Sequence, residues 1–238
     1  MQVDILAIGV HPDDVELSCA GTLLKHISLG KTVGLLDLTL GEMGTRGNAE
    51  LRTQEAMKAT KIIGASFRKQ LHFTDCFFEN NQAHLIEIIK VIREYKPQII
   101  LCNAISDRHP DHGRAAKLVA DACFYSGLVK IDTQQPAWRP KAVYHYIQDN
   151  YIHPHFVVDV TAFADKKREA IMAYSSQFYN PEAPSGSSKE PATPISSPEF
   201  LEALYSKMSI WGRTIGVRYA EGFTTARYPG VENLFDLI

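Results

Sequence analysis

Residues 3–30 read VDILAIGVHPDDVELSCAGTLLKHISLG, and this stretch decides the fold. It opens with an apolar run over residues 3–10, which the tetrad His11-Pro12-Asp13-Asp14 stops. A helical pattern of apolar residues follows and ends at Gly30, a residue type that commonly terminates helices. A strand that leads directly into a helix is the start of a strand–helix–strand unit, so the stretch predicts a parallel sheet.

The same alternation continues through the next hundred residues. We predict further strands over residues 33–39, 70–73 and 98–102, and helices over residues 50–63, 83–95 and 112–125. Strands and helices of this size alternate in sheets that carry helices on both faces. The sequence therefore predicts an α/β fold with a doubly wound, mostly parallel, Rossmann-like sheet.

The rhythm changes after about residue 128. Strands are predicted over residues 141–147 and 156–160 without a helix between them, and helices over residues 161–177 and 198–217. Residues 178–197 are rich in Pro and Ser and cannot pack a core, which predicts a mobile surface loop. We expect one domain over residues 1–238, with a Rossmann-like core in 1–127 and a C-terminal strand and helix elaboration in 128–238.

Composition excludes several classes of protein. The 238 residues include 25 Lys+Arg and 27 Asp+Glu, so the chain lacks the excess positive charge with which nucleic-acid binders displace counterions. No apolar run approaches the ~20 residues that span a bilayer, and the first residues lack the basic region of a secretory signal. The four cysteines are scattered, which predicts free thiols in a reducing cytoplasm. We expect neither nucleic acid nor membrane as a partner.

Two tetrads carry the residues best suited to chemistry, His11-Pro12-Asp13-Asp14 and His109-Pro110-Asp111-His112. Each follows a predicted strand and opens a predicted helix. Doubly wound sheets bind ligands beyond the carboxyl ends of the strands, where the strand order reverses. If the first and fourth strands are neighbours, both tetrads meet in that crevice. Together they offer three histidines and three aspartates, which suits a divalent ion that keeps one position open for water.

Aspartates at helix starts also have a purely structural use, because they cap free N–H groups and complement the helix dipole. Capping explains either tetrad alone as well as a metal site does. Two tetrads that pair histidine with aspartate, both at strand-to-helix junctions, favour the metal site.

Several segments carry a resemblance to a known family. Residues 7–16 read AIGVHPDDVE and precede Gly21-Thr22; further segments read LGEMGTRG (40–47), LRTQEA (51–56), SQF (176–178) and YAEGF (219–223). Together with the second tetrad they resemble the LmbE-like (PIG-L) zinc deacetylases over nearly the whole chain. Within that family the similarity is greatest to the branch that deacetylates N-acetylglucosaminyl malate in bacillithiol biosynthesis.

The resemblance implies roles for the residues of the tetrads. It implies three ligands of Zn²⁺: His11, Asp14 and His112. Fe²⁺ or another divalent ion can also occupy such a site. By the same resemblance Asp13 is the general base, His109 stabilises the oxyanion, and Asp111 orients or charges His109. These roles suit amide hydrolysis, since zinc lowers the pKa of water to ~7.

The resemblance also implies a small acetylated amino-sugar substrate. Residues at positions where family members contact the sugar are Glu42, Arg52 and Asp75, and candidate partners for a malate carboxylate are Arg46, Arg108 and Arg139. Salt bridging explains an arginine such as Arg52 at least as well.

The expected function is zinc-dependent removal of acetyl from an N-acetylglucosaminyl conjugate, with the malate conjugate as the first candidate. The alternatives are another N-acetylated amino sugar, an N-acyl thiol conjugate, or a non-catalytic sugar-binding protein. Family members commonly assemble as trimers or hexamers, so we expect a homo-oligomer.

Overall fold

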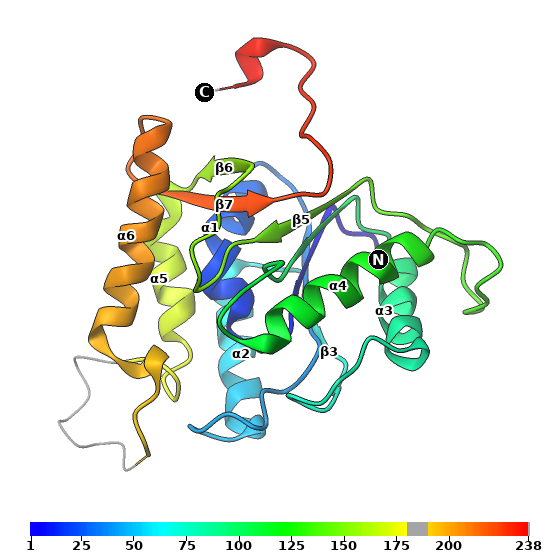
Figure 1. The fold of residues 1–238 in the computed structure, drawn as a ribbon, viewed down its shortest axis with the longest axis horizontal. Helices are drawn as coiled ribbons and strands as arrows, with labels where there is room; N and C mark the ends of the chain where they lie inside the picture. Colours follow the sequence, from blue (N-terminus) through cyan, green and yellow to red (C-terminus); the bar gives the residue numbers. More distant parts are fainter. Residues whose placement is uncertain (180–189, 238) are drawn as a thin grey trace.

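The computed structural model describes residues 1–179 and 190–237, and in them a seven-stranded sheet lies between layers of helices (Figure 1). The strands are β1 (Ile5–Gly9), β2 (Val33–Asp37), β3 (Phe67–Gln70), β4 (Ile99–Cys102), β5 (Ala142–Tyr146), β6 (Phe156–Asp159) and β7 (Ala220–Thr224). Their order across the sheet is β3-β2-β1-β4-β5-β7-β6. Strands β1 to β5 pair in parallel, and β7 runs antiparallel to both β5 and β6.

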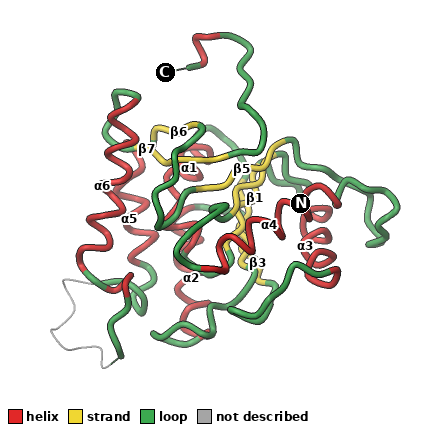
Figure 2. Tube along the Cα trace, viewed as in Figure 1, coloured by secondary structure: helices red, strands yellow, loops and turns green. Residues whose placement is uncertain are grey.

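Helices cover both faces of the sheet, as Figure 2 shows. One layer holds α1 (Asp14–Ser28), α2 (Ala49–Ile63) and α5 (Ala164–Met172); the other holds α3 (Gln82–Tyr95) and α4 (Pro110–Tyr125). Helix α6 (Pro198–Thr214) packs against β7 and reaches α2 and α5 through Leu201. The predicted doubly wound α/β fold is confirmed.

The apolar run that begins the chain forms the centre of the sheet. Every residue of β1 is buried. Leu6 and Ile8 belong to the core under α3 and α4, whereas Ile5 and Ala7 belong to the core under α1. A strand covered on both faces has no polar side, which is why it appears in the sequence as an uninterrupted apolar run.

The third strand differs from its prediction, since it covers Phe67–Gln70 rather than residues 70–73. Because its sequence contains polar and charged residues, it lacks the apolar pattern by which a strand is predicted. Arg68 is buried, and its guanidinium lies 2.6 Å from a carboxylate oxygen of Asp37 and 2.6 Å from one of Glu16. The strand therefore buries a charge together with its partners, a pattern that alternation of apolar residues does not reveal.

Strand β7 was not predicted, because its sequence, AEGFT, contains glutamate and glycine, which are rare in strands. Glu221 is nevertheless buried. Its carboxylate accepts hydrogen bonds from the Lys167 ammonium and from the backbone N–H groups of Gly21 and Thr22 in α1. The strand thus ties α1 and α5 to the C-terminal half of the sheet.

Two further boundaries in the C-terminal half differ from prediction. Helix α5 ends at Met172, not at residue 177, because the following Ser175 and Ser176 turn to donate hydrogen bonds to Glu55. Of the predicted mobile loop 178–197, residues 180–189 lie outside the described residues, while Pro194–Ser196 form a short 3₁₀ helix, η2.

The topology brings the two tetrads together. Strands β1 and β4 are adjacent, with Ala7 opposite Leu101, and the strand order reverses between them. Helix α1 begins at Asp14 and α4 at Pro110, each after the loop that follows its strand. The expected crevice at the carboxyl edge is therefore present.

Two further findings concern membrane-spanning helices and the cysteines. Within residues 1–179 and 190–237, none of the helices has both the length and the apolarity that crossing a membrane requires. The four cysteines are free thiols, as predicted.

Candidate active site

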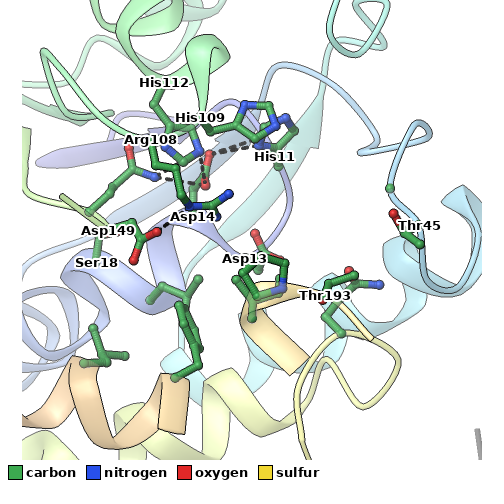
Figure 3. Close-up of a pocket in the computed structure, with 18 of the residues that line it drawn as sticks. His11, Asp13, Asp14, Ser18, Thr45, Arg108, His109, His112, Asp149 and Thr193 are labelled. Atoms are coloured by element: carbon green, nitrogen blue, oxygen red, sulfur yellow. Dashed lines mark hydrogen bonds and ion pairs between the residues drawn. The ribbon is translucent and has the colours of Figure 1, made fainter. Parts of the chain in front are cut away.

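A cavity of about 320 Å³ opens where the two tetrads meet, a size suited to a small-molecule ligand. Figure 3 shows His11, His109, His112 and Asp14 gathered on one side of it. Asp13 lies apart from them, towards the opposite side, where α6 runs. That opposite wall is largely apolar and is built from Leu17, Ile195, Phe200 and Leu204.

His11 stands at the centre of a ring of carboxylates. Its Nε2 lies 3.0 Å from Oδ1 of Asp75 and 3.5 Å from Oδ2 of Asp111. Carboxylates only accept, so Nε2 carries a proton and Nδ1, which lies 3.8 Å from Oδ2 of Asp14, keeps the lone pair of the neutral ring. Burial alone lowers the pKa of His11, but these carboxylates outweigh it and raise the pKa well above its usual value.

His112 is held in the same manner. Its Nδ1 lies 2.5 Å from Oδ2 of Asp107, and its Nε2 lies 3.2 Å from Oδ1 of Asp14. Burial lowers the pKa of His112, but the charges of Asp14 and Asp107 prevail and raise it to about 9. A cluster that favours protons on its histidines so strongly also favours a cation between them.

These residues fit a divalent ion. Two ligands bound about 2.0–2.1 Å from one tetrahedral ion lie about 3.3 Å apart. Oδ1 of Asp14 lies 3.2 Å from Nε2 of His112, and Oδ2 of Asp14 lies 3.8 Å from Nδ1 of His11. The trios His11/His109/His112 and His11/Asp75/Asp111 have ligand atoms that all lie within 4.8 Å of one another, whereas the set His11, Asp14 and His112 rests on the two contacts of Asp14. The set His11, Asp14 and His112 has one advantage: each imidazole is backed by a carboxylate, Asp75 or Asp107, as in many metal sites.

Asp13 does not cap α1, although it occupies the N-cap position. Its backbone has φ 111° and ψ −25°, a conformation that non-glycine residues rarely adopt. Its Oδ2 accepts a hydrogen bond of 2.7 Å from Nη2 of Arg52, whose guanidinium also donates to the carbonyl groups of Pro12 and Gly41. Burial raises the pKa of Asp13 to about 6, against the lowering effect of Arg52, so this carboxylate is poised to exchange protons near neutral pH.

His109 is the residue that caps α4. Its Nδ1 accepts a hydrogen bond of 3.3 Å from the backbone N–H of Asp111, which leaves Nε2–H as the donor of the neutral ring. Burial and the neighbouring His11 and His112 lower the pKa of His109, so the neutral form is favoured. Its ring can therefore offer a hydrogen bond into the cavity that it lines.

Asp111 was expected to orient or charge His109, and its backbone and its carboxylate act on that ring in different ways. Its carboxylate accepts hydrogen bonds from Arg114 (2.9 Å) and from the N–H of Cys76 (3.1 Å). The hydrogen bond that joins Asp111 to the His109 ring comes from its backbone N–H instead. Orientation of His109 thus comes from the helix start, and the carboxylate contributes its charge, which raises the pKa of His109.

The residues expected to contact substrate divide into three groups. Arg52, Asp75 and Arg108 line the cavity, but Arg52 and Asp75 are bound to Asp13 and His11 and so act on the site itself. Arg108 pairs with Asp149 at the cavity rim.

Two candidates lie behind the cavity and do not line it. Glu42 accepts hydrogen bonds from the N–H groups of Leu40 and Asp75, and Arg46 donates to the carbonyl of Ser176. Arg139 does not line the cavity either; its guanidinium donates a hydrogen bond to the carbonyl of Phe124 at the far end of α4. Helix α4 begins at the site, and its 16 residues extend roughly 24 Å from it.

Sequence reasoning missed three residues near the cluster, Asp107, Gln148 and Lys207. Asp107 had a usable signal, because a ligating histidine usually has a carboxylate partner and Asp107 lies in the loop before the second tetrad. Gln148 follows β5 and Lys207 lies in α6. Nothing in the local sequence of either residue indicates a place at the site.

Comparisons with known proteins find a matching family model and several similar proteins. Residues 6–123 match the family model described as PIG-L, GlcNAc-PI de-N-acetylase. Diacetylchitobiose deacetylase of Thermococcus kodakarensis is 28% identical, over 95% of this chain and 84% of its own length. The probable N-acetyl-alpha-D-glucosaminyl L-malate deacetylase 2 of Bacillus anthracis is 28% identical, over 73% of this chain and 81% of its own. The crystal structure of conserved protein TT1542 from Thermus thermophilus superimposes with a TM-score of 0.88 at 31% identity, covering 98% of this chain and 99% of that one.

Proposed function

The chain belongs to the PIG-L (LmbE-like) family of deacetylases, and from this premise we propose that it removes the acetyl group from an N-acetylglucosaminyl conjugate. N-acetylglucosaminyl malate is the first candidate. One observation carries the proposal: residues 11–14 and 109–112, far apart in the chain, converge on one cavity and leave the Asp13 carboxylate outside the candidate ligand set.

In the proposed site, the side chains of His11, Asp14 and His112 hold a divalent ion. Zn²⁺ suits the nitrogen and oxygen donors, and Fe²⁺ or another divalent ion is the alternative. The ion would supply polarisation of the acetyl carbonyl and acidification of a water molecule. Asp75 and Asp107 fix the ring orientation of His11 and His112 through hydrogen bonds of 3.0 and 2.5 Å.

The chain's own groups move the proton. Asp13 takes a proton from the attacking water as a C–O bond forms to the acetyl carbon. His109, through Nε2–H, donates to the oxygen on which negative charge develops. Asp13 then returns the proton to the nitrogen as the C–N bond breaks, so that a free amine leaves together with acetic acid, which gives its proton to solvent and becomes acetate. Arg52 keeps the Asp13 carboxylate in place throughout.

Substrate identity divides the proposal into two candidates with the same chemistry. Arg108 at the rim and Lys207 in the wall offer positive charge to a malate carboxylate. The identity to diacetylchitobiose deacetylase is the same as that to the malate enzyme, 28%, and extends over 95% of this chain against 73%, which supports another N-acetylated amino sugar as the second candidate. An N-acyl thiol conjugate is a further alternative substrate and is tested together with these two.

The test measures acetate release by the zinc-loaded protein. The substrates are N-acetylglucosaminyl malate, N,N′-diacetylchitobiose, N-acetylglucosamine and an N-acyl thiol conjugate. We expect turnover of at least one of them by the native protein and none by His11→Ala. Equal rates for the two proteins would defeat the proposal, and faster turnover of another substrate than of the malate conjugate would favour the second candidate.

We also propose that the chain acts as a homo-oligomer, a trimer or hexamer, in a reducing cytoplasm. The C-terminal segment leaves the body of the molecule (Figure 1), where Tyr228 and Phe235 are almost completely exposed and Leu234 is largely exposed, which supports assembly. Four free cysteines support a reducing compartment. Light scattering coupled to gel filtration tests the assembly, and a monomer would contradict it.

A further inference from the structure

Gln148, two residues after the end of β5, is held in one orientation. Its Oε1 accepts a hydrogen bond of 3.1 Å from the backbone N–H of Ala104 and another of 3.1 Å from Nδ2 of Asn103. A backbone N–H can only donate, so the atom that faces it must be the amide oxygen. The hydrogen-bond network thus settles which side of this amide carries the NH₂ group.

The NH₂ group of Gln148 consequently faces the candidate metal ligands. Its Nε2 lies 3.1 Å from Oδ1 of Asp14 and 3.3 Å from Nε2 of His112. The side chain lines the cavity yet is only 8% exposed. Lys207 of α6 donates a hydrogen bond to the backbone carbonyl of the same residue, so backbone and side chain are both fixed.

Counting hydrogens shows that one N–H of Gln148 is left for a ligand. The NH₂ group has two, and Asp14 takes the first. The second faces Nε2 of His112, whose single lone pair is no longer available once His112 serves as a metal ligand. A nearly buried donor needs an acceptor, and for this one the acceptor must come from what enters the cavity.

We propose that Gln148 donates this hydrogen bond to the carbonyl oxygen of the substrate's acetyl group, and afterwards to a carboxylate oxygen of the acetate product. The proposal rests on the proposed deacetylase function. It makes Gln148 a second donor beside His109, so that two neutral N–H groups, both fixed before substrate arrives, share the charge that develops on that oxygen.

Two substitutions and one matched control test the proposal. Gln148→Glu keeps an oxygen for Ala104 and Asn103 but removes the donor. Gln148→Ala removes the amide without adding charge. The control is Gln177→Glu, the same change at another glutamine of the cavity, whose Nε2 donates instead to Ser176 and to the carbonyl of Arg46.

The first readout is the dissociation constant of ¹³C-labelled acetate, measured by NMR titration of the zinc-loaded proteins. We expect it to rise about tenfold or more in both Gln148 variants, as loss of a hydrogen bond to a charged acceptor implies. In Gln177→Glu we expect it to stay within about twofold, because its amide faces protein groups. Elemental analysis should find equal zinc in all four proteins. On the best substrate, kcat of the Gln148 variants should fall by roughly 10²–10³.

Unchanged acetate affinity in Gln148→Ala with zinc retained would overturn the inference, whatever happens to turnover. Loss of zinc in both Gln148 variants would also overturn it, because the amide would then serve the ligands and not the substrate. A native protein that releases no acetate from any substrate marks failure of the proposed function instead.

Discussion

Asp13 combines an unfavourable backbone conformation with a buried carboxylate, two features that proteins retain mainly at functional sites. Its proposed role, accepting a proton, depends on the basicity of the carboxylate and not on the shape of the side chain. Asp13→Asn preserves the shape, and asparagine tolerates positive φ comparatively well. We expect kcat to fall by about 10²–10⁴-fold, the usual contribution of a general base, with bound zinc unchanged.

Steady-state kinetics and elemental analysis on the same preparation check this prediction. If Asp13→Asn turned over substrate at the native rate, another group would have to accept the proton. If it lost its zinc, Asp13 would belong to the ligand set. Neither result is expected, since the Asp13 carboxylate is paired with Arg52 and lies outside the candidate ligand set.

Asp107 acts on the metal only through His112, by the 2.5 Å contact with Nδ1. Removing a carboxylate behind a ligating histidine typically weakens metal affinity by about 10–100-fold. We expect that loss in Asp107→Asn, measured by competition with a chromophoric zinc chelator. The nearby Asp149 pairs with Arg108 at the rim and serves as control, because Asp149→Asn should leave zinc affinity within about twofold.

At the scale of the element, β3 offers a direct comparison between a buried and an exposed charge. Arg68 lies buried between Asp37 and Glu16, whereas the next residue, Lys69, pairs with Glu94 at the surface. Replacing Arg68 by Met leaves two buried carboxylates without a cationic partner, which should lower the free energy of unfolding by about 3–5 kcal/mol. Lys69→Met should cost less than about 1 kcal/mol. Urea unfolding of both variants measures the difference, and equal losses would contradict the role given to Arg68.

Helix α6 brings a partly buried lysine to the site, and its charge predicts a pH dependence of stability. Burial disfavours the cation and lowers the pKa of Lys207 from 10.5 to about 8. Between pH 8 and 10.5 the unfolded chain therefore binds more protons than the folded one, so this residue makes folding more favourable as the pH rises. Below pH 8 both states carry the charge, and its burial is a constant cost.

The variant Lys207→Met lacks this titration. The native protein should gain stability relative to the variant on the order of 2 kcal/mol between pH 8 and 10, and the difference should be flat below pH 7. Urea unfolding at a series of pH values gives the difference directly. A difference that did not change with pH would show that Lys207 is solvated in the folded protein.

Which elements could be predicted depends on how they achieve burial. Strands β1 and β4 are buried by apolar side chains on both faces, so their sequences reveal them. Strands β3 and β7 are buried through ion pairs, Arg68 with Asp37 and Lys167 with Glu221, and the partners lie in other elements. Patterns of apolar and polar residues within one segment cannot reveal such ion pairs, because the partner residue lies in a distant segment.

At the scale of the whole molecule, the same distinction governs the site. The two tetrads could be paired from sequence because strand order in a doubly wound sheet brings β1 and β4 together. Gln148 and Lys207 come from the C-terminal half, where topology follows no such rule. Residues far apart in the sequence could thus be predicted to meet at the site where a recurrent strand order brings them together. Residues from the C-terminal half could not be predicted in this way.

The candidate metal site joins the start of α1 to the start of α4, so an ion there links two separate strand–helix units. An ion that binds only the folded chain stabilises it by about 2.7 kcal/mol at a hundredfold excess over its dissociation constant. For a chain of this length each kcal/mol raises Tm by roughly 2–4 °C. We therefore expect Tm to fall by roughly 5–10 °C when a chelator removes the metal and to recover when zinc is returned.

His112→Ala separates this linkage from unspecific effects of zinc. The substitution removes one of three candidate ligands but leaves β1, β4 and their pairing intact. Scanning calorimetry should show the large zinc-dependent rise in Tm for the native protein and a rise of under about 2 °C for the variant, because its affinity is too low for linkage. An equal rise in both proteins would place the stabilising ion elsewhere, and no rise in the native protein would mean that the two tetrads do not share one.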